Sequence, residues 1–234
     1  MNRWTFASLL MLSVAGCSPR RDAQSGVPAQ TQTASLGKTE DETVVLIALD
    51  LSGSFRDRIA GRGEGYEFAT RVIDRYFRGR IGTQDKLVIA QISGTDRSLL
   101  WEGTPLMLQR QFPTADAFRD YLLSKADPNG SHVFKGLSHA IRYVLSDSRV
   151  ESGKAKTAVF VLSDMLDNGP DSESEEKYLN HEMAELGWRG ALIGMYWVDQ
   201  DQTLIWRQKL RQFGVKNCRV ESEIVGQPPL PSFD

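Results

Sequence analysis

The sequence predicts an α/β fold: a doubly wound, mostly parallel six-stranded sheet with one antiparallel edge strand and helices on both faces. Short apolar runs such as 44–49 and 157–162 lack polar alternation, which is typical of strands buried on both faces. Segments with apolar residues three or four positions apart alternate with these runs, as crossover helices do between parallel strands. The alternation occupies residues 43–225, about 180 residues and the size of one domain.

The elements can be placed in order along the chain. The first strand, 44–49, ends at Asp50 and runs into a turn that contains glycine. The later elements are expected to be a helix over 66–77, strands over 86–92 and 98–102, a helix from Thr114, a helix over 132–145, a strand over 156–163, a helix over 174–186, a strand over 191–198, a helix over 203–213 and a strand over 219–224. Strand 98–102 follows 86–92 with no room for a crossover helix, so it should pair antiparallel at a sheet edge. Thr114 is expected to cap its helix.

Two carboxylates that are far apart in the sequence are expected to meet in this fold. Ligands of open α/β sheets bind beyond the carboxyl ends of the strands, where the strand order reverses. With the order 3-2-1-4-5-6, that crevice lies between strand 44–49 and strand 156–163. Asp50 directly follows the first of these strands, and Asp164 directly follows the second. The predicted topology therefore brings both residues to one site.

The residues after the first strand are oxygen donors. Asp50 is followed at alternate positions by Ser52 and Ser54, and in an extended or loosely turning segment alternate side chains point to one side. One carboxylate and two hydroxyls are hard oxygen ligands, which suit Mg²⁺ or Mn²⁺ better than zinc or copper. Gly53 is expected to allow a tight turn between the two serines.

The run Asp50-Leu51-Ser52-Gly53-Ser54 resembles the DxSxS signature of von Willebrand factor type A (vWA) domains, where it forms the first part of a metal-ion-dependent adhesion site (MIDAS). The family has a Thr on a later loop, where this chain has Ser131, and an apolar strand ending in (S/T)-D, which 159–164 matches. The resemblance covers about residues 43–225 and implies a vWA/Rossmann-like fold with one metal site. It implies Mg²⁺ (or Mn²⁺ or Ca²⁺) held by Asp50, Ser52, Ser54, Ser131 and Asp164.

The chain departs from the family pattern at two places. Ser131 keeps the hydroxyl of the family's Thr but lacks the methyl group that restricts its rotamer. After Asp164 the family usually has Gly, whereas this chain has Met165, followed by Asp167. The Asp167 carboxylate could bind metal, repel a ligand's carboxylate or lie in solvent, and solvent is the default expectation.

Other polar and aromatic residues have ordinary structural explanations. His132, at a helix start beside the site, is expected to be a surface residue rather than a ligand. Trp197 and Trp206 are expected in the core, and Asp199 and Asp201 are expected to be helix caps. His139 and His181 lie on predicted helices without a second His or Cys at metal spacing. The charged run 56–58 either faces a ligand or is simply solvated.

The first residues are expected to be an export signal that is not part of the folded domain. Arg3 precedes the apolar stretch 6–14, which is too short to span a bilayer comfortably. The run Val14-Ala15-Gly16-Cys17 resembles the bacterial lipobox, which implies a signal peptide over 1–16 and a lipid on Cys17. The alternative is an ordinary secretory signal with an incidental cysteine. Ser18, where Asp would favour inner-membrane retention, favours the outer membrane. The expected location is the bacterial cell envelope, lipid-anchored and facing the periplasm.

The segments on either side of the domain lack the residues that build a core. Residues 17–42 contain few large apolar side chains and are expected to be a disordered tether. Residues 226–234 contain three prolines and are expected to be an irregular C-terminal tail. If Cys17 carries a lipid, Cys218 has no disulfide partner within the chain, and it is expected to be a thiol buried in a strand.

Charge argues against nucleic acid as a partner. The chain has 28 basic and 30 acidic residues, and without Arg3 of the signal peptide 27 − 30 leaves a net charge of −3. This is too balanced for the basic face that nucleic-acid binding requires.

We expect a binding module rather than an enzyme. The resemblance implies that an Asp or Glu of a protein partner completes the metal's coordination, as in adhesion or assembly. One alternative is a periplasmic metal-dependent hydrolase, which needs an activated nucleophile or a general base. The sequence has no His-rich cluster, no G-x-S-x-G elbow and no Ser-His-Asp set on these strand ends. The other alternative is a metal-free structural vWA module.

Overall fold

The computed structural model describes residues 42–60, 63–80, 83–93, 98–127, 132–222 and 228–233. All of them belong to one compact unit, Asp41–Asp234. The expected signal peptide and Cys17 lie outside the described residues, as do the tether up to residue 41 and Ser131. Within the described part of the chain, no helix is both long enough and apolar enough to cross a bilayer.

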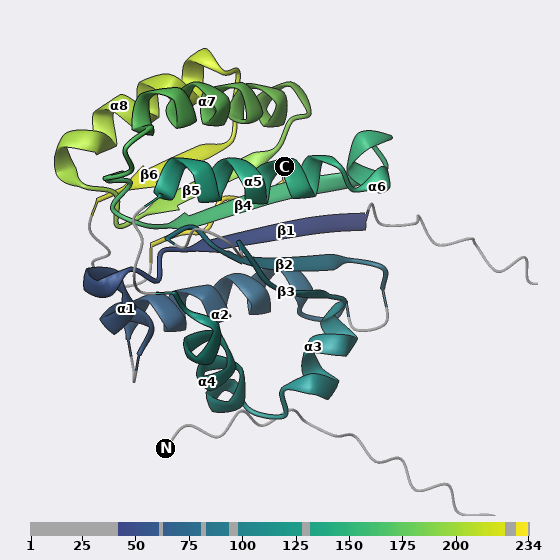
Figure 1. Cartoon of the computed structure of the whole chain (residues 1–234). Coiled ribbons are helices and arrows are strands. Elements are labelled where there is room, and N and C mark those ends of the chain that lie inside the picture. The colour runs from purple at the N-terminus through teal and green to yellow at the C-terminus, as the bar shows by residue number, and fades with distance from the viewer. Residues whose placement is uncertain are drawn as a thin grey trace, which may run out of the picture. The chain divides into compact units, whose positions relative to one another are not determined.

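The domain is built on one six-stranded sheet, in the order β3-β2-β1-β4-β5-β6 (Figure 1). Its strands are β1 (Glu42–Leu49), β2 (Lys86–Gln91), β3 (Leu99–Gly103), β4 (Ala155–Leu162), β5 (Leu192–Tyr196) and β6 (Cys218–Glu221). All neighbouring strands pair parallel except β2 and β3, which pair antiparallel. The predicted α/β class, strand order and antiparallel edge strand are confirmed.

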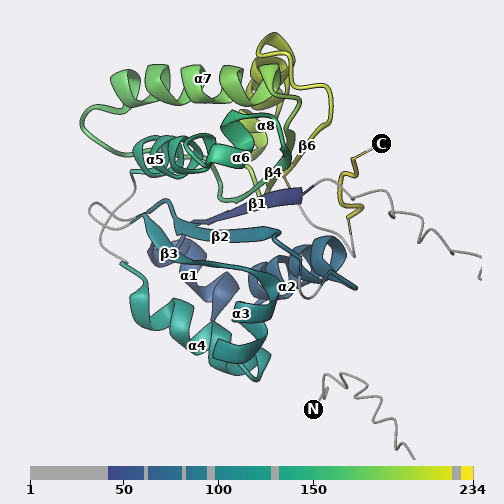
Figure 2. The ribbon, with the colours of Figure 1, turned by 90° about the vertical axis from the view of Figure 1, so that its right-hand side faces the viewer.

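Helices cover both faces of the sheet (Figure 2). They are α1 (Gly53–Ile59), α2 (Glu64–Phe77), α3 (Pro105–Gln111), α4 (Ala115–Lys125), α5 (Val133–Leu145), α6 (Ser148–Glu151), α7 (Ser172–Trp188) and α8 (Gln200–Gln212). Helices α5 to α8 lie on one side of the sheet, and α1 to α4 lie on the other. Each layer of helices packs on its face of the sheet and forms a separate hydrophobic cluster with it.

Strand β1 shows why the central strands lack polar alternation. Successive side chains of a strand point to opposite faces of its sheet. Val44, Leu46 and Ala48 enter the cluster beneath α5, α7 and α8, whereas Val45, Ile47 and Leu49 enter the cluster on the other face. All six are fully buried. A polar residue on either face would lose its water without a partner, so both faces require apolar residues.

Three short helices, α1, α3 and α6, are not predicted from the sequence. They have seven, seven and four residues, too few for apolar periodicity to be recognised. Two of these helices nevertheless have capping residues that mark a helix N-terminus. The Thr104 hydroxyl accepts a hydrogen bond from the Met107 N–H, with Pro105 at the first helical position. Asp147 caps α6 by accepting from the Arg149 N–H. The predicted cap Thr114 is confirmed, since its hydroxyl accepts from the Ala117 N–H.

Residues 228–233 have no regular secondary structure, yet they contact α2. The Arg71 Nη2 donates to the Pro228 carbonyl over 2.9 Å, and the Tyr76 hydroxyl donates to the Pro231 carbonyl over 2.6 Å. The rings of Tyr76 and Phe233 meet edge to face. This segment therefore closes the end of the core beside α2.

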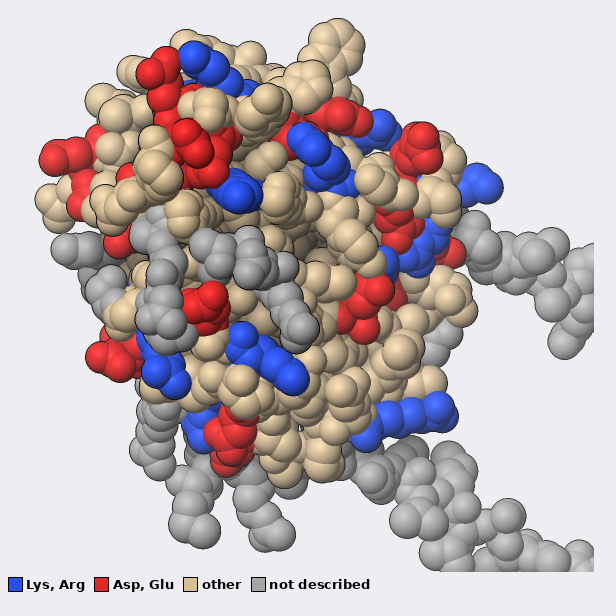
Figure 3. Space-filling view, in the orientation of Figure 1, with Lys and Arg blue, Asp and Glu red and all other residues tan. Residues whose placement is uncertain are grey.

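Charges on the surface are mixed. On the face drawn in Figure 3, basic and acidic side chains are interspersed, in keeping with the net charge of −2. Cys218 begins β6 and is half-buried, less buried than the sequence analysis expected.

Candidate metal centre

The carboxyl ends of β1 and β4 lie side by side at the centre of the sheet. The two strands pair in parallel with Leu49 opposite Leu162, and the Asp50 N–H donates to the Leu162 carbonyl over 2.9 Å. Because β2 lies on one side of β1 and β4 on the other, this is the point where the strand order reverses. Asp50 and Asp164 therefore follow neighbouring strand ends at the switch point, as the sequence predicts.

Asp50 is a buried carboxylate with neutral hydrogen-bond donors. Only 1% of its surface is exposed. Its Oδ2 accepts from the Ser163 hydroxyl over 3.0 Å, and its Oδ1 accepts from the Ser52 N–H over 2.9 Å. These two bonds fix the carboxylate between the β1 and β4 loops. Burying an ionised carboxylate is costly without a nearby positive charge, so this position suits a bound cation.

Asp164 adds negative charge at the same place. Its side chain is half-buried, and its Oδ1 accepts from the Leu166 N–H over 2.9 Å. Burial raises the pKa of the Asp164 carboxyl, and the carboxylates of Asp50 and Asp199 raise it further. The Leu166 hydrogen bond and the charge of Arg58 oppose this rise. A cation between the carboxylates would relieve their repulsion.

Ser52 presents a hydroxyl that does not cap its helix. It is the N-cap residue of α1, where a serine oxygen usually accepts from the first turn, but it makes no such bond. The backbone N–H of Ser52 points at Asp50 instead. Ser52 is half-buried, and its hydroxyl is an oxygen donor of the kind that suits a hard cation.

The expectation of an extended Ser52–Ser54 segment is wrong, because α1 starts at Gly53. Ser54 lies in the first turn of this helix, so the two serines are not related by strand alternation. Gly53 does not have the positive φ that would require glycine, and a Cβ there would meet no atom within 4 Å. The chain does turn at Gly53, since the Phe55 N–H donates to the Ser52 carbonyl over 3.0 Å, but this turn does not require glycine. The Ser54 side chain and all of Ser131 lie outside the described part of the structure.

Met165 stands where the resemblance implies Gly, and its backbone has the left-handed conformation that favours Gly. Its φ is +61°, while its side chain is 1% exposed within the core. Trp197, which follows β5, has φ of +62°. Both residues follow strand ends at this edge of the sheet. Strained backbone of this kind is concentrated at functional sites in proteins.

The end of β2 positions the neighbouring loops. The Ser93 hydroxyl accepts from the Leu51 N–H over 2.9 Å, and the Gln91 Oε1 accepts from the Asp127 N–H over 3.0 Å. Gln91 therefore holds the chain just before the loop that carries Ser131. In the sequence, Gln91 and Ser93 are marked only as polar side chains at the end of a buried apolar strand, whereas Ser163 is also the serine of the (S/T)-D pattern. The hydrogen bonds that these three side chains make were not predicted.

The remaining candidate residues divide between surface and core. His139, His181 and the charged residues Arg56, Asp57 and Arg58 are exposed. Trp197 and Trp206 are core residues and Asp199 caps α8, as expected, whereas Asp201 lies in the first turn of α8.

Asp167 is not the solvated carboxylate that was expected. It is half-buried, its Oδ2 accepts from the Phe134 N–H over 3.0 Å, and its Oδ1 accepts from the Gly169 N–H over 2.8 Å. His132 precedes α5 and is half-buried rather than a surface residue.

The described donors fit a magnesium-like cation. Asp50, Asp164 and Ser52 offer carboxylate and hydroxyl oxygens, which hard divalent cations prefer. Two of the donors are carboxylates whose charges repel each other, and the third is a hydroxyl that makes no helix-capping bond.

Comparison with known proteins adds little to this description. The sequence matches no protein family and no curated protein. Among solved structures, the crystal structure of the TFIIH p34 N-terminal domain is similar with a TM-score of 0.48 and 9% sequence identity, over 77% of this chain and 90% of that chain. A likeness this distant carries no argument about function. The doubly wound fold, consistent with a vWA/Rossmann-like domain, rests on the strand order itself.

Proposed function

We propose that this chain is a membrane-anchored, divalent-metal-dependent protein-binding module of the bacterial envelope. A Mg²⁺ ion (or Mn²⁺ or Ca²⁺) binds at Asp50, Ser52, Ser54, Ser131 and Asp164. An Asp or Glu side chain of a partner protein completes its coordination. The observation that carries this proposal is the buried Asp50 carboxylate, whose hydrogen-bond donors within the described part of the chain are neutral and which lies beside Asp164 at the switch point.

The surroundings favour an acidic partner side chain. A metal held by two carboxylates and neutral hydroxyls keeps much of its positive charge, which attracts a further carboxylate. The guanidinium of Arg58 is exposed on α1, and its charge reaches Asp164. Arg58 could thus pair with the second oxygen of an incoming carboxylate or with a neighbouring acidic residue.

The test compares Asp50→Asn with Asp57→Asn. Asn keeps the shape of Asp50 and removes the charge; its Oδ1 still accepts from the Ser52 N–H, whereas its Nδ2 has to donate to the Ser163 hydroxyl instead of accepting from it. Asp57 is an exposed carboxylate on the adjacent helix α1. A ligand that binds only the native state raises the melting temperature. Millimolar Mg²⁺ should raise the melting temperature of the wild type and of Asp57→Asn and should leave that of Asp50→Asn nearly unchanged.

Partner capture is the second measurement. Wild type and Asp57→Asn should retain envelope proteins in Mg²⁺ and release them in EDTA, whereas Asp50→Asn should retain none above background. If Mg²⁺, Mn²⁺ and Ca²⁺ leave the wild-type melting temperature unchanged and Asp50→Asn captures the same proteins, the metal-free structural module is correct instead.

A further inference from the structure

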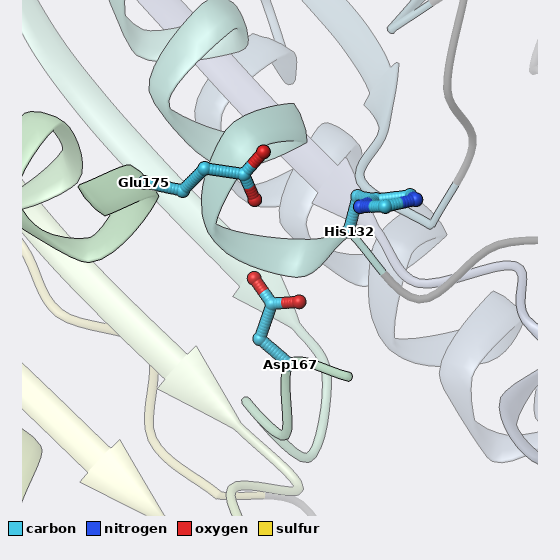
Figure 4. A group of neighbouring side chains, drawn as sticks. All are labelled: His132, Asp167 and Glu175. Atoms are coloured by element: carbon cyan, nitrogen blue, oxygen red, sulfur yellow. The ribbon is translucent and has the colours of Figure 1, made fainter. Parts of the chain in front are cut away.

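Three potential metal ligands converge from separate segments of the chain beside this centre. His132 precedes α5, Asp167 lies on the loop after β4, and Glu175 lies in the first turn of α7. One ligand atom of each lies within 4.8 Å of the other two. In Figure 4 the carboxylates of Asp167 and Glu175 point toward each other, and His132 lies beside them. Tertiary packing, not sequence proximity, assembles the group.

Two side-chain atoms of this group are buried and have no hydrogen-bond partner among the residues that the structure describes, His132 Nδ1 and Glu175 Oε2. A buried polar atom that has lost its water without gaining a partner destabilises the folded state. An imidazole lone pair that faces two carboxylates is also repelled by them, unless a positive group lies between them. That group is either a proton on Nδ1 or a metal ion.

Because Gly169 has no side chain, there is room for a metal ion between the three residues. A Cβ at this position would lie 2.8 Å from His132 Nδ1, 3.1 Å from Asp167 Oδ1 and 3.4 Å from Glu175 Oε2. A single point beside Gly169 is therefore close to all three ligand atoms, and glycine keeps side-chain atoms out of it. In addition, the Asp167 carboxylate is held in place by the Phe134 and Gly169 N–H groups, as the ligands of metal sites are held by outer hydrogen bonds.

We propose that His132, Asp167 and Glu175 bind a divalent transition-metal ion of the zinc class. One imidazole nitrogen and two carboxylate oxygens suit Zn²⁺, and three protein ligands leave a fourth position for water. Mg²⁺ prefers oxygen ligands alone, so this site is chemically distinct from the centre at Asp50. The ion joins α5, α7 and the loop after β4, and the chain segments that carry Ser131 and Asp164 adjoin its ligands.

The experiment is a calorimetric titration of the purified full chain with ZnCl₂ in saturating Mg²⁺. Glu175→Gln removes one ligand charge with little change of shape, and Gly169→Ala leaves every ligand but fills the space between them. Glu173→Gln is the matched control, because Glu173 is an exposed carboxylate in the same turn of α7. Asp50→Asn separates this site from the proposed magnesium centre. Melting curves in EDTA establish that each variant is folded.

Wild type, Glu173→Gln and Asp50→Asn should each bind one Zn²⁺ per chain with equal affinity. Glu175→Gln and Gly169→Ala should bind at least about 100-fold more weakly, the upper end of the effect of losing an outer hydrogen bond to a ligand. If the wild type binds no Zn²⁺, or if all variants bind it equally, a proton on His132 joins the three side chains and the proposal is wrong. Because Asp50→Asn retains this site, failure here is distinguishable from failure of the magnesium centre.

Discussion

At the scale of single residues, Met165 combines a strained backbone conformation with a side chain whose burial stabilises the fold. Its left-handed φ of +61° costs a non-glycine residue about 1–2 kcal/mol. Its side chain is 1% exposed in the cluster beneath α5, α7 and α8, and truncating a buried methionine costs about 2–5 kcal/mol. Because burial outweighs strain, the chain tolerates a methionine where glycine would fit the backbone better.

This balance predicts that two variants of Met165 have the reverse of the usual order of stability. Met165→Ala and Met165→Gly should both unfold more easily than the wild type, because each loses the buried side chain. At an ordinary position a protein with Gly is less stable than the same protein with Ala by about 0.4–1 kcal/mol. At position 165 Gly relieves the strain that Ala retains, so Met165→Gly should be the more stable variant by about 1 kcal/mol in urea unfolding. The usual order, with Ala the more stable, would mean that residue 165 is not left-handed in solution.

Asp147 is a carboxylate whose ionisation stabilises the fold. It caps α6, and both of its oxygens accept from the Arg149 guanidinium over 2.9 Å. These bonds lower the pKa of the Asp147 carboxyl to about 2 from its ordinary 3.8. As pH falls, the unfolded chain therefore takes up this proton before the folded chain does, and folding loses the contribution.

Asp147→Asn isolates this effect, because Asn is an equally good helix cap. The variant should be less stable than the wild type by about 1–2 kcal/mol at neutral pH, given about 1.4 kcal/mol for each pKa unit. The difference should be complete above about pH 4, shrink between about pH 4 and 2, and vanish below that range. Urea unfolding of both proteins at about pH 7, 5 and 3 measures it. A difference that does not change with pH would show that the Asp147 charge does not contribute.

At the scale of elements, α5 packs unusually close to the end of β2. A Cβ at Gly136 would lie 2.7 Å from the Ile92 Cα and 2.8 Å from the Ile92 carbonyl oxygen. These are backbone atoms, which cannot rotate away as a side chain can. The close approach sets the position of α5, and with it the position of His132 at the start of the helix.

Two glycine substitutions should therefore differ in their effects on stability. Gly136→Ala should destabilise the protein by about 1–3 kcal/mol through overpacking, despite the better helix propensity of alanine. Gly53→Ala, at the start of α1, meets no atom within 4 Å and should be neutral or stabilising by up to about 1 kcal/mol. Thermal unfolding in EDTA compares them without any contribution from metal. An equal loss in both variants would contradict the packing of α5 against β2.

At the scale of the whole molecule, the proposed function requires that the domain be attached to a membrane. Cys17 should carry the lipid, because the run 14–17 resembles a lipobox. Cys17→Ala should abolish labelling by radioactive palmitate and leave an unprocessed precursor. Cys218→Ala is the control and should keep the label, since Cys218 lies in β6 of the folded domain. A Cys17→Ala protein that is still labelled and still membrane-bound after a carbonate wash would reveal another anchor.

The sequence by itself determined the sheet and the two carboxylates at its switch point. Apolar runs without polar alternation identify strands buried on both faces, and their alternation with helices limits the possible strand orders. The strand order then places Asp50 and Asp164 side by side, because each directly follows a central strand. These inferences succeed because they depend on local periodicity and on few topological rules.

Only the tertiary structure decided the surroundings of those carboxylates. The Ser163 hydroxyl on Asp50, the left-handed Met165 and the helical start at Gly53 depend on how the loops pack, which local periodicity does not encode. The group of His132, Asp167 and Glu175 is the clearest case. Its members come from three segments with no shared motif, and they meet because α5 and α7 pack on the same face of the sheet. Contacts between distant segments follow from the packing of whole elements, so no short stretch of sequence reveals them.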